Sequence, residues 1–159
     1  MKTTHLAMIL ALAVAGCAQT GGPAPGGASS GHGIPPGMDG AGNVIDASKV
    51  EAGHGQQIKG INDYSGEITG HPAPNSRFAQ LQIGMGLRQV VDLLGPPSDQ
   101  GAYITGKAFI PFYFGSDRAR LELVYRSQGR LIFAGGMLGD YSGGNLIWII
   151  NCPTEPGYR

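Results

Sequence analysis

Apolar and polar residues recur over the C-terminal half of the chain in a pattern that predicts two helices. Over residues 87–94, apolar side chains stand at positions i, i+3, i+4 and i+7, which places them on one face of a helix. Gly95 and Pro96 follow directly and are expected to end that helix. A shorter first helix is predicted over residues 75–81, because Ser76 can cap its N-terminus.

The segments after these helices have the periodicity of strands. The aromatic segment 109–114 contains Pro111, which has no N–H for a ladder, so we place it at a sheet edge or a bulge. Apolar and charged residues alternate over 118–125, and a Ser-Gln-Gly turn then predicts a hairpin into a strand over 131–134. The apolar run 146–150 predicts the last strand. The order predicts an α+β two-layer fold, with two short helices packed on a three- to four-stranded antiparallel sheet.

The N-terminal residues predict a lipoprotein signal peptide over residues 1–16. An unbroken apolar run, residues 6–15, has about half the length that a membrane-spanning helix needs. The run ends in a branched residue, two small residues and a cysteine, which are Val14, Ala15, Gly16 and Cys17. This order resembles the lipobox of bacterial lipoproteins, in which the thiol is the nucleophile that takes a diacylglyceryl group. We therefore expect a covalent lipid on Cys17 and stable attachment to a membrane.

Two neighbouring features refine that expectation. Lipoproteins of this kind that stay at the inner membrane often have Asp after the cysteine, whereas this chain has Ala18. The resemblance therefore implies the outer membrane, with the protein facing the periplasm. Lipidation of Cys17 leaves Cys152 without an intramolecular partner. We expect Cys152 to be buried beside the last strand and inert, with an intermolecular disulfide as the alternative.

Composition divides the chain into a tether and a folded part. The sequence has 28 Gly and 11 Pro among 159 residues, and no aromatic residue precedes Tyr64. A glycine-rich segment without aromatic residues buries too little apolar surface to offset the entropy of ordering it. We therefore expect a disordered tether over residues 17–60, a domain over 61–155 and a short tail over 156–159.

Charge gives candidates for a contact surface. Lys and Arg together number 11, as do Asp and Glu, which argues against a nucleic-acid binder. Four arginines of the predicted hairpin are candidates for partner binding: Arg118, Arg120, Arg126 and Arg130. Most would share the solvent face of the sheet, either as a plain polar surface or as a docking patch for an acidic protein or anionic lipid head groups. The glycine-rich loop 135–144, with Met137 and Tyr141, is a second candidate.

Nothing in the residue pattern predicts catalysis or a metal site. The histidines are isolated, and two of them, His32 and His54, fall on the expected tether. The segment 101–108 nearly matches a phosphate-binding P-loop, but its last residue is Ala108, which has no hydroxyl for Mg²⁺. We expect no enzyme activity, no cofactor besides the lipid, no nucleic acid and no small-molecule substrate.

Residues 81–97 resemble the signature of the SmpA/OmlA (BamE-like) family of outer-membrane lipoprotein domains. The matching positions are Gly84, Met85, Val90, Leu94, Gly95 and Pro97. From the residues alone, each has a structural role: glycines for turns, Met85 for core filling, and Pro97 to direct the chain toward the sheet. Gly86 stands where the family has a Ser or Thr helix cap, which glycine replaces nearly as well.

The resemblance covers about residues 75–151 and implies a function. It implies a non-catalytic accessory of outer-membrane β-barrel protein assembly or envelope integrity, bound to an envelope complex such as the β-barrel assembly machinery. The alternative is a periplasmic module that binds or inhibits a soluble protein, since β-lactamase-inhibitor-like domains share the same layout of helices before a sheet.

Overall fold

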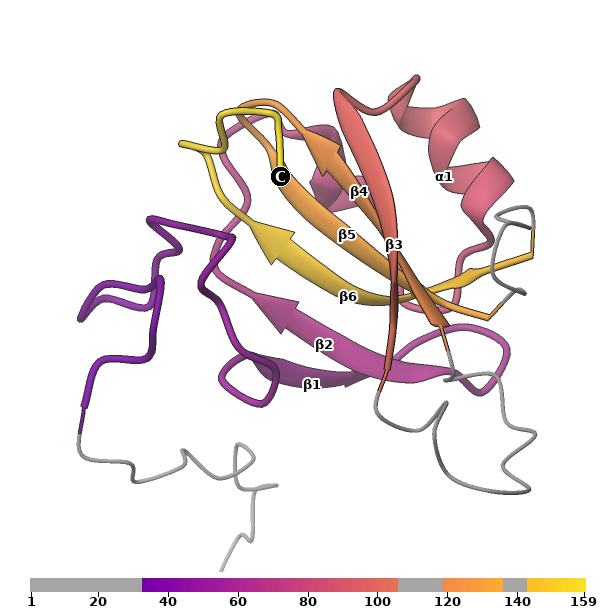
Figure 1. Ribbon diagram of the computed structural model, residues 1–159. Coiled ribbons are helices and arrows are strands. Elements are labelled where there is room, and N and C mark those ends of the chain that lie inside the picture. Colours follow the sequence, from indigo (N-terminus) through magenta and orange to yellow (C-terminus); the bar gives the residue numbers. More distant parts are fainter. Residues whose placement is uncertain (1–32, 106–118, 136–142) are drawn as a thin grey trace, which may run out of the picture. The chain divides into compact units, whose positions relative to one another are not determined.

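Within the described residues, a mixed sheet of six strands forms the centre of the molecule (Figure 1). The computed structural model describes residues 33–105, 119–135 and 143–159. In chain order the elements are β1 (Gln56–Lys59), β2 (Ser65–Thr69), the 3-10 helix η1 (Arg77–Gln80), α1 (Leu87–Leu94), β3 (Asp99–Ile104), β4 (Ala119–Tyr125), β5 (Gly129–Ala134) and β6 (Asn145–Asn151). The strands lie in the order β1-β2-β6-β5-β4-β3. β2 and β6 are parallel, and the other neighbouring pairs are antiparallel.

The sheet is larger than the sequence predicted. The α+β class is confirmed, and β4, β5 and β6 form the antiparallel series predicted after the helical elements; β3, which pairs with β4, was not predicted. β1 and β2 form a further hairpin, and β2 joins the sheet in parallel beside β6, with Ile68 opposite Ile149. The expected sheet of three to four antiparallel strands is therefore wrong, because β1, β2 and β3 are short and polar and carry little periodicity. The predicted strand over 109–114 lies outside the described residues.

One of the two predicted helices is confirmed. α1 begins after its N-cap Gly86 and ends at Leu94, followed by the C-cap Gly95, whose φ of 85° favours glycine. The first predicted helix is instead the single 3-10 turn η1, in which the Ser76 hydroxyl accepts a hydrogen bond from the Phe78 N–H (3.2 Å). The turn ends at Leu81, which is extended. Among the described residues, no helix is long and apolar enough to span a membrane.

The chain leaves η1 early because the next residues run along the sheet. The Gly84 N–H donates to the Leu146 carbonyl (2.7 Å), and the Leu146 N–H donates to the Met85 carbonyl (2.8 Å). Gly84 has a φ of 92°, and a side chain there would collide with the Ile61 carbonyl oxygen. This connection holds the start of α1 beside β6.

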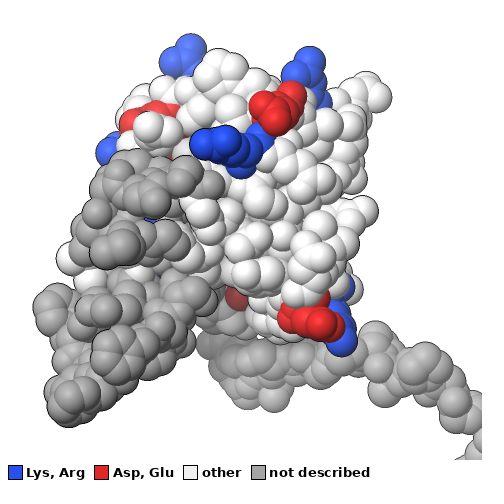
Figure 2. All heavy atoms as spheres, turned by 90° about the vertical axis from the view of Figure 1, so that its right-hand side faces the viewer, with Lys and Arg blue, Asp and Glu red and all other residues white. Residues whose placement is uncertain are grey.

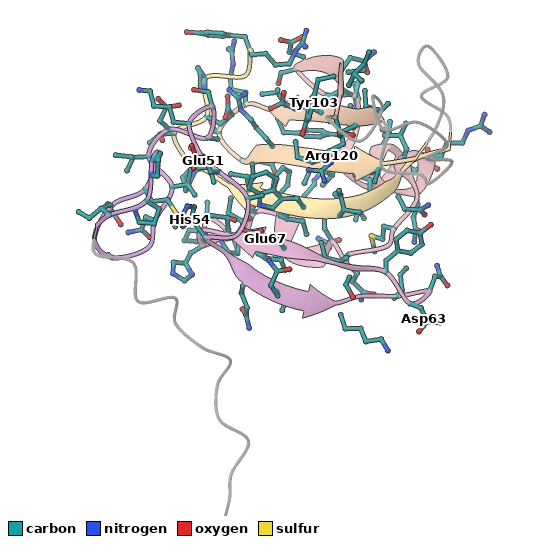
Figure 3. The ribbon with its side chains drawn as sticks, turned by 60° about the horizontal axis from the view of Figure 1, so that its bottom comes forward. Glu51, His54, Asp63, Glu67, Tyr103 and Arg120 are labelled. Carbon is teal, nitrogen blue, oxygen red and sulfur yellow. The ribbon has the colours of Figure 1, made fainter. Side chains whose placement is uncertain are left out.

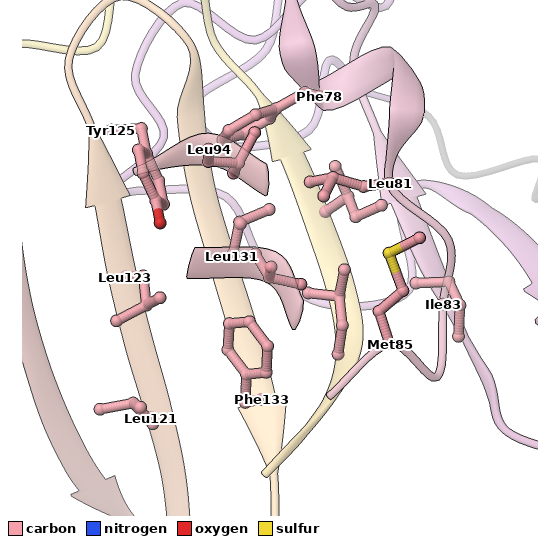
Figure 4. Close-up of a cluster of buried hydrophobic side chains, with 13 residues drawn as sticks. Phe78, Leu81, Ile83, Met85, Leu94, Leu121, Leu123, Tyr125, Leu131 and Phe133 are labelled. Carbon is pink, nitrogen blue, oxygen red and sulfur yellow. The ribbon is translucent and has the colours of Figure 1, made fainter. Parts of the chain in front are cut away.

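A continuous apolar core lies between the sheet and the two helical elements α1 and η1 (Figure 4). The predicted alternation in β4 is confirmed, since Leu121, Leu123 and Tyr125 all belong to this core. The rings of Phe78 and Tyr125 meet edge to face, with centroids 5.7 Å apart. The Tyr125 hydroxyl donates to the Gly95 carbonyl (3.1 Å), and desolvation by burial raises the pKa of Tyr125 to about 12. The end of α1 is thereby tied to β4.

The opposite face of the sheet is covered by residues that the sequence assigned to the tether. Met38 and Val44 are buried and pack in one cluster with Trp148 of β6. The expectation of a disordered tether up to residue 60 is therefore wrong for residues 33–60. A few apolar residues are enough to order this segment, because they pack on an apolar sheet face and do not need to form a core among themselves.

Hydrogen bonds give this glycine-rich segment a defined path. The Asp39 carboxylate accepts the side-chain amide of Asn43 (2.9 Å) and the N–H groups of Asn43 and Ala41 (2.8 and 2.9 Å). These bonds lower the pKa of Asp39, the Asn43 side chain most of all. Met38 and Val44 form an antiparallel bridge across the turn, so both reach the sheet from one compact loop.

The last residues also fold back onto the sheet instead of forming the expected tail over 156–159. The Arg159 N–H donates to the Asp99 carboxylate (2.9 Å), and the Arg126 guanidinium donates to the Pro156 carbonyl (3.1 Å). Cys152, at the start of this segment, is 1% exposed, so its predicted burial is confirmed. The C-terminal residues are therefore part of the folded domain.

Candidate functional site

An open groove crosses the sheet face opposite α1 and is the candidate functional site. Its volume is about 340 Å³, at the lower end of the range typical of ligand-sized pockets. Strands β1, β2, β6, β5 and β4 contribute to its walls. The lining residues are Ala52, Gln57, Tyr64, Ser65, Gly66, Glu67, Arg120, Ala134, Ile147 and Trp148.

Glu67 is the buried acidic residue of this groove (Figure 3). Its Oε1 accepts the Gly55 N–H (2.6 Å), and its Oε2 accepts the Gly53 N–H (2.7 Å) and the Gln57 side-chain amide (3.1 Å). Both carboxylate oxygens are thus engaged inside the protein. Glu67 therefore holds the loop before β1 against β2, and its acceptor capacity is used for structure.

A chain of hydrogen bonds extends from Glu67 to the aromatic residue of the groove. The Trp148 indole N–H donates to the Thr69 hydroxyl (2.9 Å), which in turn donates to Glu67 Oε1 (3.1 Å). Trp148 lies directly opposite Glu67 in the parallel register of β2 and β6. The network fixes the indole ring in one orientation and joins the two strands.

The cationic residue of the groove is Arg120 of β4. It is partly exposed and lies opposite Tyr103 of β3 in the antiparallel register (Figure 3). Tyr103 and the next residue, Ile104, are among the exposed large apolar side chains of the described chain. Arginine and aromatic side chains are enriched at protein interfaces, because they combine apolar contact area with directed hydrogen bonds. This end of the groove therefore carries residue types that are common at protein interfaces.

The other arginines predicted to bind a partner lie in different environments. Arg126 is exposed at the turn after β4, where it binds the C-terminal segment. Arg130 is only 6% exposed, so the expectation that it belongs to a partner-binding surface is wrong. Arg118, together with Met137 and Tyr141 of the predicted contact loop, lies outside the described residues.

Arg130 is the centre of a buried ion cluster. Its guanidinium contacts Glu155 (Nε to Oε2, 2.9 Å) and Glu122 (Nη1 to Oε1, 3.0 Å), and it donates to the Tyr158 carbonyl (3.2 Å). Desolvation by burial disfavours the charge of Arg130, but the bonds to Glu155 and Glu122 outweigh it and raise the pKa of Arg130. The cluster clamps the C-terminal segment onto β4 and β5, which is a structural role.

The motif residues shared with the BamE-like signature occupy structural positions. Met85, Val90 and Leu94 are buried in the core between α1 and the sheet. Gly84 and Gly95 have positive φ values, as their predicted turn and cap roles require. Pro97 is half-buried just before β3, where it was expected to direct the chain toward the sheet.

Other predicted chemistry is placed as follows. The first part of the P-loop-like segment, residues 101–104, belongs to the extended strand β3. His54 and His71 are both exposed, and no cluster of three metal-ligating side chains occurs among the described residues. The lipobox from Val14 to Cys17 lies outside the described part of the chain.

Surface charge is finely mixed on the side where α1 lies. On the face drawn in Figure 2, basic and acidic side chains of the described residues stand in small groups among uncharged ones. A docking surface built on one sign of charge therefore has no support among the described residues of that face.

Sequence reasoning missed two residues that organise this face, Glu67 and Glu155. The only local signal for Glu67 was a polar residue inside a short alternating stretch after Tyr64. Glu155 gave no signal, because its partner Arg130 lies on another strand. No family model, curated protein or solved structure matches the chain, so its function has to be argued from this geometry and from the N-terminal sequence.

Proposed function

We propose that this chain is an outer-membrane lipoprotein, anchored through a lipid on Cys17 and facing the periplasm, whose folded domain binds an envelope protein without catalysis. The process we propose is β-barrel protein assembly or envelope integrity, which the BamE-like resemblance of residues 81–97 implies. The observation that carries the proposal is the lipobox Val14–Cys17 at the end of an apolar run of signal-peptide length.

The groove supports the partner-binding part of the proposal. Arg120 lines the groove and is partly exposed, and the exposed Tyr103 opposite it adds aromatic contact area. The buried bonds of Trp148 and Glu67 keep this surface in one shape, which reduces the entropy lost on binding. A preorganised groove of this kind is suited to recognising a segment of another protein.

Anchoring explains why a small groove can be sufficient. A lipid on Cys17 confines the domain near the membrane, so a partner in the same membrane meets it at a high effective concentration. A contact that is weak in solution then becomes occupied, provided that the tether lets both sites engage at once.

The test is cross-linking in cells that express the tagged chain, followed by solubilisation of the outer membrane and identification of the co-purified proteins. We expect the β-barrel assembly machinery to be recovered, and to be lost in a Cys17→Ala variant. Arg120→Glu should weaken recovery, whereas Arg88→Glu, an exposed site on α1, should leave it unchanged. Circular dichroism of both arginine variants controls for folding.

Each part of the proposal has its own contrary outcome. A Cys17 peptide of unmodified mass would reject the lipid anchor. Equal recovery with Arg120→Glu and Arg88→Glu would reject the groove as the contact site. Recovery of a single soluble periplasmic protein would favour the binding or inhibitor module over an assembly role.

A further inference from the structure

The exposed large apolar side chains of the described residues come from β3 and from the N-terminal and C-terminal segments. Tyr103 and Ile104 lie at the end of β3, beside the groove. The other three are Ile34, Ile45 and Tyr158, which are 65%, 60% and 64% exposed. Ile34 and Ile45 come from residues 33–52, which cover the sheet face opposite α1, and Tyr158 comes from the segment after β6.

These two segments meet on one side of the domain, away from α1. The Thr154 hydroxyl donates to the Ile45 carbonyl (3.3 Å), which joins the C-terminal segment to the N-terminal one. Ile45 and Tyr158 line the same surface cavity of about 280 Å³. Ile34 lies on the same N-terminal loop, next to Gly40. We call Ile34, Ile45 and Tyr158 the apolar rim.

The apolar rim lies close to the point where the anchor enters the domain. Only residues 18–32 separate the lipidation site Cys17 from the first described residue, Gly33. Even fully extended, a segment of this length spans at most roughly 50–55 Å. A domain of this size has a radius of gyration of about 14 Å, so the connection keeps the domain within about two of its own diameters of the anchor.

We propose that the apolar rim rests on the lipid surface and that Ile34, Ile45 and Tyr158 insert between the head groups of the membrane that holds the anchor. This inference rests on the proposed lipid anchor at Cys17. The short connection keeps Ile34 within reach of the bilayer, and exposed aliphatic and tyrosine side chains gain stability at a membrane interface. The groove with Arg120, on another part of the sheet, is then presented at a fixed height.

The charges around the rim determine the kind of lipid contact. Lys49 is paired with Asp46 (2.8 Å), and Arg159 is paired with Asp99 (3.4 Å). Paired charges have little net attraction for anionic head groups. The contact is therefore apolar, and we expect it to persist at high salt and on vesicles of neutral phosphatidylcholine.

The experiment uses residues 18–159 with a histidine tag in place of Cys17, bound to phosphatidylcholine vesicles that contain nickel-chelating lipid. A polarity-sensitive fluorophore is attached at Lys49→Cys, beside the rim, or at Asp92→Cys on α1, both in a Cys152→Ala background. We expect a blue shift of the emission on vesicle binding for the label at 49 and none for the label at 92. Ile34→Ser/Ile45→Ser/Tyr158→Ser should abolish the shift without releasing the protein from the vesicles.

Three results would overturn the inference: no shift at position 49, an equal shift at both positions, or a shift that survives the triple substitution. Thermal unfolding of the triple variant controls for its fold, and the exposure of all three side chains predicts little change. Because the tag replaces the lipid, this test stands even where mass analysis of Cys17 rejects the proposed anchor.

Discussion

The two faces of the sheet are stabilised in different ways. The face under α1 is held by a continuous apolar core in which Leu123, Leu131 and Phe133 are almost fully buried. The opposite face combines a smaller apolar cluster with two buried polar networks, centred on Glu67 and Arg130. A periodic apolar face can be predicted from neighbouring residues, whereas a polar network depends on partners that are distant in the sequence and meet only in the fold.

The largest loss of stability is expected when the residues that cover the sheet face opposite α1 are removed. A chain that begins at residue 61 lacks β1 and residues 33–52, which exposes Trp148 and leaves Glu67 without its donors from Gly53 and Gly55. We expect no cooperative thermal transition for this chain, whereas a chain that begins at residue 33 should unfold cooperatively. Equal stability of the two chains would mean that the second face needs no cover.

The next largest effect is expected from Arg130→Leu. This variant leaves the carboxylate of Glu155, whose side chain is 0% exposed, without its cation. Removing one partner of a buried ion pair costs about 3–5 kcal/mol, and urea unfolding measures that loss. The matched control is Arg130→Leu/Glu155→Leu, which should recover part of the stability because only the partly exposed carboxylate of Glu122 is then left without its cation. A single variant as stable as the parent would contradict the clamp.

Two neighbours on β5 compare the faces directly. Leu131 is 0% exposed and belongs to the core under α1, while Ile132 is 3% exposed and belongs to the cluster of the second face. Replacing either by Ala should cost about 3 kcal/mol, because both leave a cavity in packed surroundings. Denaturant unfolding of both variants gives the comparison. A loss at Ile132 below about 1 kcal/mol would show that the second face packs loosely.

A smaller effect is expected from Glu67→Gln. The amide group of Gln turns a donor toward the N–H of Gly53 or Gly55, so at least one charge-assisted bond is lost, at a cost of about 2 kcal/mol. Hydrogen exchange should accelerate at those two glycines. Glu51→Gln, an exposed site in the same segment, is the control and should leave their exchange unchanged.

The smallest effect concerns pH. The hydrogen bond from Lys49, then that from Ser48, lowers the pKa of Asp46 from 3.8 to about 2. A lowered pKa stabilises the folded state above about pH 3.8, and this contribution is lost as the pH falls through about 2. An NMR titration of the Asp46 carboxyl measures it. Lys49→Ala should move the midpoint upward, and an unmoved midpoint would contradict this assignment.

Predictions from neighbouring residues were correct where the interactions that define an element lie within that element. α1 has its predicted bounds, because its apolar face, its cap at Gly86 and its stop at Gly95 all lie within one short stretch. The hairpin of β4 and β5 was predicted for the same reason. The first helix failed because hydrogen bonds from Gly84 and Leu146, distant in the chain, compete with its continuation.

The candidate site was predicted only in part. Arg120 was chosen from an alternating pattern and does line the groove. Arg130 came from the same pattern and is buried, because the C-terminal segment with Glu155 folds over it. Alternation separates the two faces of a strand but does not say whether another segment covers one of them.

The sequence by itself determined the α+β class, the bounds of α1, the burial of Cys152 and the hairpin of β4 and β5, because neighbouring residues decide each of these features. Only the tertiary structure decided that residues 33–60 belong to the domain and that Arg130 pairs with Glu155. The physical reason is that a buried contact gains its free energy from two distant segments at once, so neither segment alone carries the signal.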